Sequence, residues 1–97
     1  MQTYAILRRN GWRSPEDLKA AGDRSTQVGE EMADDVSWIR SYVLEEDSGS
    51  LGTVCIYQAT SLEAIRKHAS LAELPLDEIV PVADTVVVRP DPEAAVA

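Results

Sequence analysis

The chain has 97 residues, 44% of them hydrophobic and 27% charged, which is the composition of one ordinary globular domain. Its 9 Lys and Arg against 17 Asp and Glu give a formal net charge of −8, which argues against nucleic acid and membrane as partners because both select basic surfaces. The one cysteine cannot form an internal disulfide, and no apolar run is long enough for a signal peptide or a membrane span, so we expect a cytoplasmic protein.

The first predicted elements are a strand and a helix. Residues 4–9 form a short β-favouring run that ends at the turn signal Asn10-Gly11. Ser14 can then cap a helix over residues 14–33, in which apolar and small side chains recur at spacings of three and four. Two glycines inside this segment each cost about 1 kcal/mol relative to alanine, which leaves a break in the helix as an alternative.

A hairpin and a second helix follow. Residues 36–47 and 51–58 are rich in β-favouring side chains, and Ser48-Gly49-Ser50 between them indicates an antiparallel hairpin. The residues from Thr60 onward have the spacing of a capping box, which predicts a helix that begins there and ends before Leu74-Pro75.

The last predicted strand covers residues 79–89, through the run Thr85-Val86-Val87-Val88. Residues 1–89 then form a single domain, and residues 90–97 form a flexible tail. The complete order is β-α-β-β-α-β, the ferredoxin-like α+β fold, in which an antiparallel sheet carries both helices on one face. The opposite face is left open, and we expect the function to reside there.

The two hairpin strands predict what the open face carries. With Leu44 opposite Leu51, one face has aliphatic side chains that we assign to the helix-covered core, namely Ile39, Val43, Val54 and Ile56. The other face, assigned to the open side, combines aromatic and polar side chains: Trp38, Arg40, Tyr42, Thr53, Cys55 and Tyr57. Such aromatics are typical of interfaces and ligand pockets. We therefore expect a homodimer in which two open faces meet, with a small-ligand cavity or an isolated amphipathic surface as the alternatives.

The remaining candidates for chemistry are His68, Cys55 and several acidic pairs. His68 is the only histidine and lies at the edge of the apolar stripe of the second helix, where it is either structural or a metal ligand joined by carboxylates from elsewhere. Cys55 fits a small buried apolar side chain better than a nucleophile. The acidic pairs fit solvated surface, with weak binding of divalent cations as the alternative.

Three motifs occur in order along the chain: W-x-x-S-Y from Trp38, C-x-Y-x-A from Cys55, and A-I-x-x-H-A from Ala64. With these motifs the chain resembles, from about Tyr4 to Val88, a family of small bacterial ferredoxin-like domains of unknown function that includes a nickel-binding protein. The resemblance implies a homodimer, assembled like a dimeric α/β barrel, that binds nickel or another divalent metal. It makes His68 a candidate ligand and implies no organic cofactor. A single histidine offers few of the imidazole ligands that nickel favours.

Three functions follow from these observations. The first is a small non-enzymatic homodimer that binds a divalent metal, through His68 and carboxylates, or another small ligand. The second is a cofactor-free monooxygenase or isomerase of the dimeric α/β-barrel type, with Arg40 orienting an anionic substrate and a tyrosine donating a proton. Its pocket would be lined by Trp38, Arg40, Tyr42, Cys55 and Tyr57. The third is an interaction domain whose aromatic face binds a partner.

Overall fold

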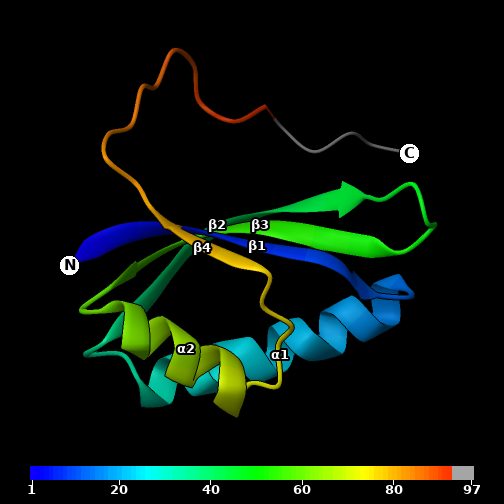
Figure 1. The fold of residues 1–97 in the computed structure, drawn as a ribbon, viewed down its shortest axis with the longest axis horizontal. Coiled ribbons are helices and arrows are strands. Elements are labelled where there is room, and N and C mark those ends of the chain that lie inside the picture. Colours follow the sequence, from blue (N-terminus) through cyan, green and yellow to red (C-terminus); the bar gives the residue numbers. More distant parts are fainter. Residues whose placement is uncertain (93–97) are drawn as a thin grey trace.

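The computed structural model describes residues 1–92, which form a four-stranded sheet with both helices on one face (Figure 1). The elements are, in chain order, β1 (Gln2–Trp12), α1 (Pro15–Glu31), β2 (Val36–Glu45), β3 (Leu51–Ala59), α2 (Leu62–Leu71) and β4 (Glu78–Pro81). Neighbouring strands are antiparallel, in the spatial order β2-β3-β1-β4. This arrangement confirms the predicted ferredoxin-like α+β fold. Of the predicted flexible tail, residues 93–97 lie outside the described part of the chain.

The connection from β1 to α1 differs from the predicted turn. Asn10 has a φ of 52°, a left-handed conformation that asparagine tolerates, and the pairing of β1 with β3 shifts between Arg8 and Trp12. The turn signal therefore marks an irregularity inside a longer strand. Ser14 caps α1 as predicted, since its hydroxyl accepts a hydrogen bond from the backbone N–H of Asp17 at 3.2 Å. The helix runs unbroken through both of its glycines.

The predicted hairpin of β2 and β3 is confirmed, and the cap of α2 lies one residue later than predicted. Ser61, rather than Thr60, accepts a hydrogen bond from the backbone N–H of Ala64 at 3.1 Å. The Thr60 hydroxyl instead donates to the Asp35 carboxylate at 3.1 Å. The capping-box spacing favoured Thr60, because Glu63 follows it by three residues, but serine is at least as good an N-cap residue and Ser61 occupies that position.

The last strand is shorter than predicted. β4 ends at Pro81, whereas residues 85–88 form an irregular segment with three exposed valines. β4 lies at the edge of the sheet beside β1, and Tyr4 lies opposite Pro81, so a longer β4 would run past the start of β1 at Gln2. Residues 85–88 favour β structure, but no strand of the described part of the chain lies beside them with which they could pair, so they form no strand. After β4 the chain instead passes over the sheet face that the helices leave open (Figure 1).

The core lies between the sheet and the helices. Tyr4 and Ile6 of β1 pack there with Tyr57 of β3, Val28 of α1 and Ile65 of α2. Burial of this apolar surface holds both helices against one face of the sheet. None of the helices in residues 1–92 combines the length and the apolar character needed to span a membrane.

Candidate ligand-binding pocket

A bulge in β2 decides which of its side chains reach each face of the sheet. Trp38 lies opposite Tyr57 as predicted, but the pairing shifts by one residue at Ile39, so that Arg40 lies opposite Ile56. A shift of one residue reverses the faces of all side chains that follow it. Trp38 therefore faces the helices and stacks on Tyr57, whereas Arg40 faces the open side.

The predicted faces of β3 are reversed. Thr53, Cys55 and Tyr57 are buried beneath the helices, whereas Val54 and Ile56, which we had assigned to the core, are only partly buried and lie on the open face. This prediction was wrong because β3 carries apolar side chains on both faces. Alternation within a strand shows which residues share a face, but it does not show which face the helices cover.

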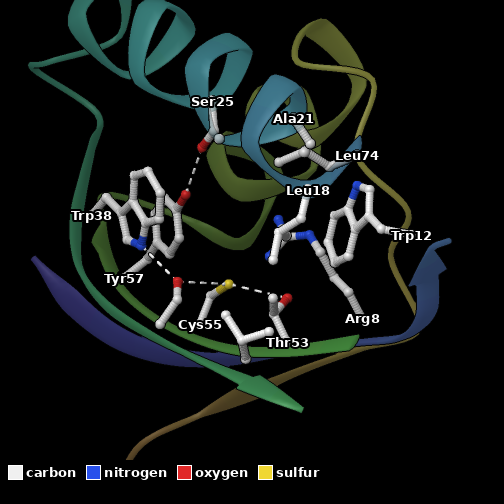
Figure 2. Close-up of a pocket in the computed structure, with 13 residues that line it drawn as sticks. Arg8, Trp12, Leu18, Ala21, Ser25, Trp38, Thr53, Cys55, Tyr57 and Leu74 are labelled. Atoms are coloured by element: carbon white, nitrogen blue, oxygen red, sulfur yellow. Dashed lines mark hydrogen bonds between the residues drawn. The ribbon is translucent and has the colours of Figure 1, made fainter. Parts of the chain in front are cut away.

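The five predicted site residues lie in two separate cavities. Trp38, Cys55 and Tyr57 line a cavity of about 160 Å³ between the sheet and α1, which we call the inner pocket (Figure 2). Arg40 and Tyr42 line a wider space of about 690 Å³ between the open face and the segment that follows β4, which we call the outer cleft. The single pocket that the enzyme hypothesis requires is therefore not assembled within residues 1–92.

Small side chains on α1 leave room for the inner pocket. Ala21, Gly22 and Ser25 face the sheet from this helix, and a Cβ added at Gly22 would meet no atom within 4 Å. The rest of the lining is mainly apolar and includes both tryptophans of the chain, Trp12 and Trp38. The ring of Trp38 stacks on Tyr57 with centroids 6.0 Å apart and an interplanar angle of 7°. The pocket is therefore walled by flat aromatic surfaces.

A chain of hydrogen bonds fixes one wall of the inner pocket (Figure 2). Trp38 Nε1 donates to Ser41 Oγ at 2.8 Å, and the Ser41 hydroxyl donates to Cys55 Sγ at 3.0 Å. The Cys55 thiol then donates to Thr53 Oγ1 at 3.4 Å. Cys55 thus both accepts and donates a hydrogen bond within the wall, as expected for a buried structural thiol.

Arg8 is a residue of this pocket that sequence reasoning missed. Its side chain is 1% exposed and reaches from the middle of β1 into the inner pocket (Figure 2). Its Nε and Nη2 atoms have no hydrogen-bond partner in the described part of the chain. The signal that could have found it is the alternation of Tyr4, Ile6 and Arg8, three buried positions of β1 of which the last carries a charge.

Two buried titratable side chains lie against Ser25 of α1. The Ser25 hydroxyl shares a hydrogen bond of 2.9 Å with the Tyr57 hydroxyl, and its backbone carbonyl accepts one of 3.1 Å from His68 Nε2. Burial raises the pKa of Tyr57, so its phenol stays protonated at neutral pH. Burial also lowers the pKa of His68, and the positive charge of Arg8 acts in the same direction, so the imidazole is neutral.

The surroundings of His68 were tested against the nickel site that the resemblance implies. The side chain is 2% exposed rather than at the edge of the helix stripe, and its Nε2 already donates to the Ser25 carbonyl. Within residues 1–92, no three His, Cys, Asp or Glu side chains are grouped so that they could hold a metal ion. The described residues therefore do not fit a nickel ion, which needs several donors and favours imidazole among them. A role of His68 as a nickel ligand stays a prediction.

Three polar side chains of the outer cleft, Arg40, Tyr42 and Asp91, contact each other. Arg40 Nη1 forms an ion pair with Asp91 at 3.1 Å, and the Tyr42 hydroxyl donates to the same carboxylate at 2.9 and 3.0 Å. These contacts tie the segment after β4 to the open face of the sheet. The arginine that the enzyme hypothesis assigns to a substrate anion thus already contacts a carboxylate of its own chain.

Comparisons with known proteins agree with the fold and with the sequence resemblance. The crystal structure of SCO4226 from Streptomyces coelicolor A3(2) is similar to this structure with a TM-score of 0.68 and 19% sequence identity, over 87% of this chain and 99% of that chain. At this identity the similarity supports the fold alone. No curated protein matches the sequence. The family model described as nickel responsive protein SCO4226-like matches residues 4–82, and the chain therefore belongs to this family.

Proposed function

We propose that the protein is a non-enzymatic binding protein that takes a small organic ligand in the inner pocket. The observation that carries the proposal is a mainly apolar cavity of about 160 Å³ with aromatic walls. An engineered apolar cavity of about 150 Å³ in another protein binds benzene. The inner pocket therefore has room for a molecule built on one six-membered ring.

The groups in the pocket wall support binding rather than catalysis. General acid–base catalysis is most efficient when the pKa of the catalytic group lies near the operating pH. Burial moves the pKa of Tyr57 upward and so further from neutrality, and its hydroxyl is already bonded to Ser25. Cys55 is held between Ser41 and Thr53. These side chains give the pocket its shape.

Nickel enters the proposal through the description of the family. Binding of nickel by His68 would require the imidazole to leave the Ser25 carbonyl and to gain further donors from a second copy or from residues outside 1–92. A metal ion would also meet the positive charge of Arg8 in the inner pocket. We therefore assign the organic ligand, rather than the metal, to this pocket.

The proposal includes a homodimer, because apolar side chains remain exposed on and beside β2. Ile39 and Tyr42 are each 45% exposed on this edge strand, and the valines at 86–88 are more exposed still. An edge strand presents unpaired backbone N–H and C=O groups, and large apolar side chains beside it favour association. A second copy of the chain would cover both the unpaired backbone groups of β2 and the exposed apolar side chains.

A pocket-filling variant tests the proposed ligand site. Gly22→Leu places a large side chain in the inner pocket, and Ala20→Leu makes a matched change on the exposed side of the same helix. The measurement is the shift in unfolding temperature on adding benzoate, benzamide or toluene, since a ligand that binds only the folded state raises it. We expect at least one probe to stabilise the wild type and Ala20→Leu, and none to stabilise Gly22→Leu.

The proposal fails if none of the three probes stabilises the wild type. It also fails if Gly22→Leu responds as strongly as Ala20→Leu, because the probe would then bind elsewhere. Circular dichroism of both variants confirms that they share the wild-type fold.

A further inference from the structure

Arg8 is a buried cation that has no ionic partner among residues 1–92. The ion pairs found in residues 1–92 are Arg9–Glu46, Lys19–Asp23, Arg24–Glu73 and Arg40–Asp91, none of which involves it. Its Nε and Nη2 atoms also lack a hydrogen-bond partner among the described residues. Buried charges in proteins are normally paired, because a charge taken out of water is costly to leave uncompensated. The guanidinium therefore requires an anion that these residues do not supply.

The inner pocket is the route by which an anion can reach Arg8. Figure 2 shows its side chain extending from β1 into the space between Trp12 and Tyr57. The lining there is mainly apolar, and a buried water needs two to four polar partners. A water there could accept hydrogen bonds from Arg8, but the mainly apolar lining offers few acceptors for its own two protons, whereas an anion accepts without having to donate.

Thr53 supplies a second donor beside Arg8. The two residues lie directly opposite each other in the pairing of β1 with β3, and both line the inner pocket. The hydrogen-bond chain that begins at Trp38 ends with the Cys55 thiol donating to Thr53 Oγ1. Because that oxygen acts as an acceptor, the hydroxyl proton of Thr53 is left to donate. An anion next to Arg8 can thus accept hydrogen bonds from two neighbouring strands.

We infer that the ligand of the inner pocket is a small monoanion, a carboxylate attached to a flat apolar body about the size of a benzene ring. This inference rests on the proposed function. The planar guanidinium matches a carboxylate in a two-pronged hydrogen bond. The aromatic walls and the volume of about 160 Å³ fit the apolar body. Among the described residues that line this pocket, Arg8 is the one cation, which fits a single negative charge better than a phosphate dianion.

Calorimetry with three probes separates the charge from the apolar body. Benzoate carries both, benzamide keeps the ring without the charge, and formate keeps the charge without the ring. For the wild type we expect benzoate to bind at least about tenfold more tightly than benzamide, because it adds a hydrogen bond between charged groups. We expect it also to bind more tightly than formate, because it buries an apolar ring.

Variants of Arg8 test the anchor directly. Arg8→Met should weaken benzoate at least about tenfold and remove its advantage over benzamide. Arg8→Lys keeps the charge without the planar fork and should restore part of the affinity. Arg9→Met is the matched control, because Arg9 is the next residue of β1, its side chain is 55% exposed, and it does not line the inner pocket. Removing an unpaired buried charge should raise the unfolding temperature of ligand-free Arg8→Met, which shows that this variant folds.

Each contrary result has a separate meaning. If benzamide binds the wild type as tightly as benzoate, or if Arg8→Met keeps the wild-type affinity for benzoate, the anionic ligand class is wrong although the pocket still binds. If formate binds as tightly as benzoate, the inference that the ligand carries an apolar body is wrong. If benzoate, benzamide and toluene all fail to bind, the proposed function itself is wrong.

Discussion

His68 and Tyr57 lie beside each other beneath α1, with ring centroids 5.4 Å apart. Burial removes the water that would solvate an imidazolium, and the charge of Arg8 has the same sign, so the pKa of His68 lies below its ordinary value of 6.5. The hydrogen bond from Nε2 to the Ser25 carbonyl opposes this shift but does not cancel it. The folded protein therefore contains a neutral imidazole.

We predict that the stability of the protein falls as the pH is lowered below 6.5. In that range the unfolded chain protonates His68 while the folded protein does not, so the unfolded state binds more protons until the pH reaches the lower folded pKa. Urea unfolding at about pH 7 and about pH 5.5 measures the loss. His68→Gln, whose amide can still donate to Ser25, should lose less free energy of unfolding over this interval. Equal losses in both proteins would contradict the assignment.

Arg8 shows why part of the candidate site could not be read from the sequence. Charged residues are almost never fully buried unless they are paired, so an arginine in a strand is ordinarily assigned to the surface. Its phase in β1, shared with Tyr4 and Ile6, contradicts that assignment, but only once the helix-covered face is known. Trp38, Cys55 and Tyr57 were named as candidates from the alternation within β2 and β3, and the structure places all three in the lining of the inner pocket. That they bind a ligand stays a prediction.

The edge strand β2 exposes large side chains on both of its faces. Trp38 and Val43 remain 43% and 54% exposed on the helix side, and Tyr42 is 45% exposed on the other. The bulge at Ile39 adds a further apolar side chain to the same edge. Natural edge strands are usually protected by charge, by brevity or by a covering element. This pattern supports the proposed contact with a second copy.

We predict that Ile39→Asp converts the dimer to a monomer. The side chain is 45% exposed in the single chain, so the charge costs little there, but it would be buried without a partner in the dimer. Leu71→Asp is the control, since Leu71 is 54% exposed on α2, on the opposite side of the sheet. Light scattering during size-exclusion chromatography should give two chains for the wild type and the control, and one for Ile39→Asp. A monomeric wild type would contradict the proposed homodimer.

Local sequence signals predicted where the helices and strands lie. Pairing between strands that are distant in the sequence determined the bulge in β2 and the end of β4. The Ser14 cap and the spacing within α1 are properties of adjacent residues, and that helix was predicted to within two residues at each end. The bulge at Ile39 and the end of β4 at Pro81 depend on which strand lies alongside. No pattern within β2 or residues 79–89 contains that information, so Trp38 and Arg40 were predicted on one face and β4 was predicted too long.

The molecule combines an acidic surface with a buried positive charge. Its net charge is −8, whereas the inner pocket is lined by Arg8, for which the described part of the chain provides no ion pair. An acidic surface favours metal cations and the charge of Arg8 disfavours them, so we expect the proposed organic anion in the inner pocket and any bound metal ion outside it. The ferredoxin-like fold hosts many functions, so the function of this chain has to be argued from its own pockets.

The two tryptophans provide the most direct test of the ligand site. Trp12 and Trp38 are the only tryptophans in the sequence, and both line the inner pocket. A two-dimensional ¹H–¹⁵N NMR spectrum therefore contains two indole N–H signals, each reporting on one wall. During a titration with benzoate, we expect both signals to shift and to saturate together with the backbone amides of α1 that line the pocket. If both indole signals stay in place while benzoate is added to saturation, the inner pocket is not a ligand site.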